Sequence, residues 1–95
     1  MSHSSWEEIK AQRADDPEAQ AGYEQARRAY EIGREVRRQR EAAGLTQRQL
    51  ADRAGMTQSV IARLEAGGTE PTLATLDRVA KALGLELTVR FQRVA

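Results

Sequence analysis

Four residues between positions 58 and 63 carry side chains that could recognise the edges of DNA bases. At about 100° per residue in a helix, one side of this segment is small and polar, formed by Gln58, Ser59, Ala62 and Arg63. The opposite side is apolar, formed by Val60, Ile61 and Leu64. Small residues let a helix backbone lie deep in the major groove, where Gln pairs with adenine and Arg with guanine. The pattern predicts a base-reading helix with a packed back.

Two short helices joined by a glycine-containing turn are expected to position these residues. Thr46 and Gln49 have the spacing of a capping box, which opens a helix through Ala54. Gly55 then forces a turn, and Thr57 caps the second helix, which ends at the glycine pair 67–68. This order is typical of a helix-turn-helix motif.

The rest of the chain is also predicted to be mainly helical. Capping and breaking residues predict further helices over 5–14, 17–43 and 72–83. After Gly84, apolar and polar residues alternate from residue 85 to residue 92, which indicates one amphipathic β-strand. We therefore expect a helical extension over 1–30, a DNA-binding domain over 31–84 and a C-terminal strand over 85–95.

The composition excludes several classes of function. The 95 residues suffice for one modest domain, and they include no cysteine and a single histidine. A disulfide framework, a thiolate metal site and a histidine-based triad are therefore excluded, and we expect no cofactor, no metal and no catalytic residue. A mean hydropathy of −0.66 and the absence of a long apolar run predict a cytoplasmic protein without a membrane segment.

The net charge of +1 conceals an uneven distribution. Residues 1–22 hold five acids and two bases, whereas residues 23–66 hold six acids and nine bases. The basic central block suits contact with DNA phosphates, and the acidic arm suits a basic protein partner. Considered without the motifs, such charges are more often just the solvated surface of a small helical domain.

The central segment resembles the Xre/Cro-type helix-turn-helix of phage and bacterial repressors. The resemblance extends from residue 32 to residue 85 and is carried by Arg40, Gly44-Leu45-Thr46-Gln47, Leu50-Ala51, Gly55, Thr57-Gln58, Ile61, Leu64-Glu65, Gly67, Pro71 and Leu83-Gly84. It implies a mainly α, five-helix DNA-binding domain. It also implies that Arg40 and Glu65 form a structural ion pair and that Gln47 contacts a phosphate and braces Gln58. The full set of phosphate contacts that the resemblance implies is Gln47, Arg48, Thr57 and Thr69.

The loop after the base-reading helix departs from this family pattern. Relatives often carry Lys or Arg there, whereas this chain has Gly67-Gly68-Thr69-Glu70. Glu70 would either face the DNA unfavourably or point away from it. We expect modest affinity per subunit, so that binding depends on dimerisation.

The C-terminal strand is expected to pair with the same strand of a second copy. An antiparallel pairing about Thr88 would place Glu86 opposite Arg90, and it would join apolar residues to apolar residues. The residues expected to form this dimer contact are Leu85, Leu87, Thr88, Val89 and Phe91. A homodimer would read an inverted-repeat operator with its two reading helices about 34 Å apart. The alternative is a frayed tail.

The overall layout resembles the HigA-type antitoxins of type II toxin–antitoxin modules. This resemblance is carried by the order of the predicted elements. An aromatic N-terminal helix is followed by the sequence Asp-Pro-Glu at 16–18, where the next helix begins, and then by a long helix, the Xre-type motif and a terminal strand. It implies neutralisation of a basic RelE-like HigB toxin, an mRNA endonuclease, together with repression of the shared operon. The positions expected to contact the toxin are Trp6, Ile9, Arg13, Tyr23 and Tyr30. The same aromatic residues could instead simply extend the hydrophobic core.

Two hypotheses about a regulatory function therefore stay open, and an enzymatic function is disfavoured. The first is an antitoxin that represses its own operon, and the second is a stand-alone Xre-type regulator of phage or host genes. A RelE-like reading frame beside the gene separates them. Catalysis lacks candidate residues, because His3 has no catalytic neighbour and the glycine pair 67–68 is not followed by the lysine of a phosphate-binding loop.

Overall fold

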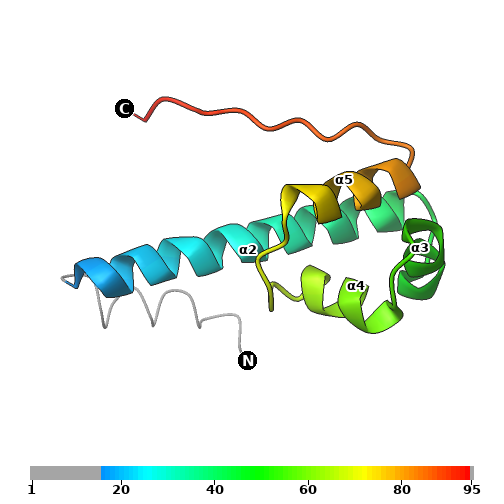
Figure 1. Ribbon diagram of the computed structural model, residues 1–95, viewed down its shortest axis with the longest axis horizontal. Helices are drawn as coiled ribbons and strands as arrows, with labels where there is room; N and C mark the ends of the chain where they lie inside the picture. Colours follow the sequence, from blue (N-terminus) through cyan, green and yellow to red (C-terminus); the bar gives the residue numbers. More distant parts are fainter. Residues whose placement is uncertain (1–15, 95) are drawn as a thin grey trace.

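The computed structural model describes residues 16–94 of the chain, and these residues form four helices joined by short turns. The helices are α2 (Pro17–Ala42), α3 (Gln47–Ala54), α4 (Gln58–Glu65) and α5 (Leu73–Ala82). The last three gather around the C-terminal half of α2, while its N-terminal half extends beyond them (Figure 1). The helix predicted over 5–14 lies outside the described residues.

Capping residues define where the helices begin. The carboxylate of Asp16 accepts hydrogen bonds from the backbone N–H groups of Glu18 and Ala19 at 3.0 and 3.4 Å, and Pro17 occupies the first helical position of α2. The capping box predicted at the start of α3 is present, because Thr46 and Gln49 exchange side-chain to backbone hydrogen bonds of 2.9 and 3.0 Å. These contacts satisfy N–H groups that the first turn of a helix cannot satisfy itself.

One apolar cluster joins the four helices. Its fully buried large side chains each expose 2% of their surface or less and come from α3, α4 and α5: Leu50, Ile61, Leu64 and Val79. Val36 adds the contribution of α2 to the same cluster. Burying a side chain of this size stabilises a fold by about 1.5–3 kcal/mol relative to exposing it. The cluster therefore holds α4 against α2 and α3 against α5.

Gly33 allows the backbones of α2 and α4 to approach closely. A β-carbon at this position would contact the carbonyl oxygen of Leu64 and would lie only 2.7 Å from the carbonyl oxygen of Glu65. Glycine within a helix costs about 1 kcal/mol relative to alanine. Here that cost is offset by contacts across the α2–α4 interface that no larger residue would permit.

The prediction of five helices and a C-terminal β-strand was wrong for the part of the chain that the structure describes. The helix-turn-helix domain contains the C-terminal half of α2 together with α3, α4 and α5, and no fifth helix follows α5 within residues 83–94. The segment from residue 85 to residue 94 is instead an extended tail that runs back past α5 (Figure 1). Its alternating residues satisfy the side-chain pattern of a strand, but no neighbouring strand pairs with its backbone in residues 16–94.

The expected boundary between residues 30 and 31 lies within α2, which is continuous from residue 17 to residue 42. None of the helices described in residues 16–94 is long and apolar enough to cross a membrane.

Candidate nucleic-acid interface

The turn between α3 and α4 has the geometry of a helix-turn-helix. Helix α3 ends at Ala54 and is capped by Gly55, whose φ of 71° lies in the left-handed region where glycine avoids the steric cost of a β-carbon. Two residues later, the side chain of Thr57 accepts a hydrogen bond of 3.2 Å from the N–H of Val60 and begins α4. The two eight-residue helices are thus joined by a turn of three residues.

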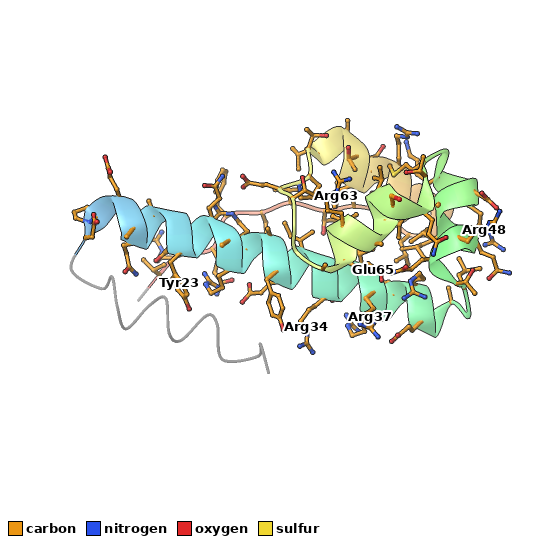
Figure 2. The ribbon with its side chains drawn as sticks, turned by 90° about the horizontal axis from the view of Figure 1, so that it is seen from below. Tyr23, Arg34, Arg37, Arg48, Arg63 and Glu65 are labelled. Carbon is orange, nitrogen blue, oxygen red and sulfur yellow. The ribbon has the colours of Figure 1, made fainter. Side chains whose placement is uncertain are left out.

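Helix α4 buries one side and exposes the other. Ile61 and Leu64 are almost completely buried against the core. Gln58, Ser59 and Arg63 are exposed, and Ala62 is half-buried. Within the described residues the side chain of Arg63 makes no hydrogen bond or ion pair, and Figure 2 shows it on the side of α4 away from α2. A free guanidinium beside small and amide side chains can donate paired hydrogen bonds to a base edge.

A buried ion pair holds the end of α4 to α2 and to the start of α3. Arg40 donates two hydrogen bonds to the carboxylate of Glu65, at 2.6 and 3.1 Å, and a third, at 2.7 Å, to the carbonyl of Leu45. The hydrogen bond to Glu65 raises the pKa of Arg40 above its ordinary value, although burial acts in the opposite direction. Figure 2 places Glu65 between α4 and α2.

The side chain of Gln47 belongs to this buried cluster and not to the exposed side of α4. Its side-chain amide donates a hydrogen bond of 3.0 Å to Glu65, where the family resemblance implied a contact with Gln58. The same amide nitrogen carries a second N–H, which is left over for a further acceptor.

The remaining residues expected to contact phosphates come from different parts of the motif. Arg48 is exposed near the N-terminus of α3, well separated from Arg63 in Figure 2. Thr57 is exposed at the N-terminus of α4, and Thr69 is exposed in the loop that follows α4.

Glu70 points toward α2. Its carboxylate accepts a hydrogen bond from the side chain of Gln25 and lies 3.9 Å from the guanidinium of Arg28. The acid in the loop after α4 is therefore held by the protruding half of α2.

Arg78 was not expected to belong to the site. From α5, its guanidinium donates hydrogen bonds to the carbonyl oxygens of Ala54 and Gly55, at 2.9 and 2.8 Å. No local sequence signal could have identified this residue, because its acceptors lie more than twenty positions earlier in the chain.

The residues expected at the dimer contact lie along the extended tail. Leu85 and Val89 expose 42% and 65% of their surface, and Phe91 is fully exposed. Thr88 is exposed and Leu87 is half-buried. The tail, α2 and α5 line a groove of about 760 Å³ whose walls include Ile32, Val36, Leu73, Leu76 and Val79.

The residues expected to contact a toxin are only partly described. Trp6, Ile9 and Arg13 lie outside the described residues. Tyr23 and Tyr30 are half-buried on α2. The hydroxyl of Tyr30 accepts a hydrogen bond of 3.1 Å from Arg34, which raises the pKa of Arg34 above its ordinary value. Tyr23, Arg34 and Arg37 lie along the same side of α2 in Figure 2.

Among residues 16–94 no three histidine or carboxylate side chains gather in a group that could hold a metal ion.

Fold and site together define a DNA-binding helix-turn-helix domain. The chain belongs to the helix-turn-helix family, whose pattern matches residues 36–89, more than half of its length. The matched segment begins in the C-terminal half of α2 and continues into the extended tail.

Several curated proteins share this segment. An uncharacterized HTH-type transcriptional regulator of Methanothermobacter thermautotrophicus is 45% identical over 51 residues, which are 54% of this chain and 74% of that protein. The HTH-type transcriptional regulator y4dL of Sinorhizobium fredii is 45% identical over 58 residues, 61% of this chain and 30% of its own length. The immunity repressor protein of Bacillus phage phi105 is 37% identical over 57 residues, 60% of this chain and 40% of its own length.

The chain thus spans less than half of the length of y4dL and of the phage repressor. No solved structure matches it.

Proposed function

We propose that this protein represses transcription by binding an inverted-repeat operator in double-stranded DNA as a homodimer. The observation that carries the proposal is the exposed side of α4, where the side chain of Arg63 has no partner among the described residues while Ile61 and Leu64 anchor the helix in the core. The names of the relatives, which include transcriptional regulators and an immunity repressor, support the same class of function.

In the proposed complex α4 lies in the major groove. The base-reading residues are Gln58, Ser59, Ala62 and Arg63, and the phosphate contacts are Gln47, Arg48, Thr57 and Thr69. Gln47 keeps one N–H for a phosphate while the other remains on Glu65. Base contacts supply specificity and phosphate contacts supply much of the affinity.

The operator can be found by selecting duplexes from a random-sequence library with the full chain. Arg63→Ala is then expected to weaken binding to the selected duplex by about 1–3 kcal/mol and to relax the preference at one base position. Arg38→Ala is the matched control, because it removes the same charge from an exposed position on α2 that is paired with Glu35.

A selection that recovers no preferred sequence contradicts the proposal. An equal loss of affinity for every sequence in the Arg63 variant would make that residue a phosphate contact instead of a base contact.

We place the dimer contact in the C-terminal segment 85–95. Two apolar residues of its tail are exposed, Val89 largely and Phe91 completely. This exposure is unfavourable for a monomer in water. We expect Val89→Ser with Phe91→Ser to shift the full chain toward the monomer in sedimentation and to weaken operator binding. Gln92→Ala is the control. An unchanged dimer in the double variant would place the contact elsewhere.

An antitoxin role is the second candidate. It is favoured by the N-terminal half of α2, which lies outside the segment matched by the family and extends beyond the other helices (Figure 1). In this proposal the extension 1–30, through Trp6, Ile9, Arg13, Tyr23 and Tyr30, binds a basic RelE/HigB-like mRNA endonuclease.

The antitoxin proposal is tested by co-expression with the product of an adjacent RelE-like reading frame. The full chain should restore growth, and a chain that begins at Ala21 should not. Rescue by the shortened chain would contradict toxin binding by the extension. The absence of such a reading frame would favour the stand-alone regulator.

A further inference from the structure

The C-terminal end of α3 contains carbonyl groups that the helix itself cannot satisfy. The last carbonyls of a helix have no N–H partner within it, and they form the negative end of its dipole. Two of them are satisfied by the turn, because the N–H of Met56 donates to Ala51 at 2.9 Å and that of Gly55 donates to Asp52 at 3.4 Å.

Arg78, from another helix, satisfies two further acceptors, the carbonyl of Ala54 at the end of α3 and that of Gly55 in the turn. Its Nη2 atom lies 2.9 Å from the oxygen of Ala54 and 2.8 Å from that of Gly55. The contact is close enough that a β-carbon on Gly55 would lie 3.0 Å from the same nitrogen. A positive charge at this end of α3 is favoured by the dipole as well as by the two hydrogen bonds.

The backbone that carries Arg78 is firmly held. Val79, the next residue of α5, exposes only 2% of its surface and belongs to the core cluster with Leu50 of α3 and Ile61 of α4. Arg78 therefore connects a fixed helix to the three-residue turn that ends at Thr57, the N-cap of the reading helix.

We propose that Arg78 is a positioning residue for sequence-specific DNA binding. By holding the carbonyls of Ala54 and Gly55, it fixes the angle between α3 and α4, so that phosphate contacts from α3 and base contacts from α4 are made at the same time. The inference rests on the proposed function, and it concerns a residue outside both sets of DNA contacts.

The role predicts a loss of discrimination between sequences. Specific binding requires both helices to be placed together, whereas binding to an unrelated duplex depends mainly on charge near phosphates. Arg78→Met keeps the length of the side chain and removes its donors. Arg78→Lys keeps the charge and a donor. Lys81→Ala is the control, since it removes a charge from an exposed position one turn along α5 that is paired with Asp77.

The experiment measures binding of the full-length variants to the selected duplex and to an unrelated duplex, over a range of salt concentrations and well below each melting temperature. For Arg78→Met we expect about tenfold weaker binding to the selected duplex, less than twofold change on the unrelated duplex and an unchanged salt dependence. Arg78→Lys should recover most of the affinity, and Lys81→Ala should bind like the wild type. If Arg78→Met does not fold, Arg78→Leu, which also lacks a donor, takes its place with the same expected result.

Three results would overturn the inference. Unchanged discrimination in the Arg78 variants would show that the turn does not need this residue. Equal losses on both duplexes, with a salt dependence smaller by about one phosphate contact, would show that Arg78 touches the DNA backbone itself. Failure of the wild type and of Lys81→Ala to distinguish the two duplexes would overturn the proposed function and the inference with it.

Discussion

Removing Glu65 should destabilise the protein far more than removing any exposed acid. Glu65→Ala leaves the guanidinium of Arg40, whose side chain is only 11% exposed, with the carbonyl of Leu45 as its single remaining acceptor within residues 16–94. It also removes the acceptor of the Gln47 amide. Removal of one partner from a buried ion pair costs about 3–5 kcal/mol, because the other charge stays buried without compensation.

This loss is large compared with the stability of a small domain. Such domains are stable by about 5–15 kcal/mol, so the variant should be close to unfolding under mild conditions. The double variant Arg40→Met with Glu65→Leu removes both charges and fills a similar volume. It should recover most of the lost stability, since apolar replacement of a whole buried pair is often nearly neutral.

The assay is urea unfolding followed by far-ultraviolet circular dichroism at one fixed protein concentration, because the stability of a dimer depends on concentration. Glu41→Ala is the control. Glu41 pairs with Arg37 at 3.1 Å, but both side chains are more than half exposed, and we expect a loss below about 0.5 kcal/mol. A loss below about 1 kcal/mol for Glu65→Ala, or a double variant as unstable as the single one, would refute the reasoning.

Two further predictions concern α2. Gly33→Ala should lower the free energy of unfolding by about 1–3 kcal/mol, because its methyl group would meet the backbone of α4. Gly22 has open space around it, so Gly22→Ala should raise the free energy of unfolding by about 0.5–1 kcal/mol in the same urea experiment. Hydrogen bonds from Arg38 and then Gln39 lower the pKa of Glu35 below its ordinary value of 4.5. The stabilisation from the Glu35 carboxylate should therefore be present above that value and disappear as the pH falls through the lowered pKa. The stability difference between wild type and Glu35→Gln should accordingly vanish in acid, and a difference that persists there would contradict this assignment.

The limits of the described helices could be predicted because their signals act over a few residues. Asp16 with Pro17, and Thr46 with Gln49, satisfy N–H groups no more than three positions away, so the sequence contains both partners of each contact. The apolar spacing in α4 correctly identified Ile61 and Leu64 as core residues, but it was wrong for Val60, which is exposed because it lies at the edge of the packed side. The base and phosphate contacts stay predictions, because they depend on a DNA partner.

The C-terminal tail shows where a local pattern is insufficient. Alternation of apolar and polar residues predicts which side chains share a face, but a β-strand also requires a neighbouring backbone to exchange hydrogen bonds. Within residues 16–94 no such neighbour is present, and the segment stays extended without becoming a strand.

Local sequence signals were sufficient to predict α2, α3, α4 and α5, their N-caps and the burial of Ile61 and Leu64 in α4, because each depends on residues close together in the chain. Three contacts could be recognised only in the folded chain: the close approach at Gly33, the hydrogen bond from Gln47 to Glu65 and the hydrogen bonds from Arg78 to the turn. These contacts join residues from 18 to more than 30 positions apart. Their partners become neighbours only when burial of the shared core brings the helices together.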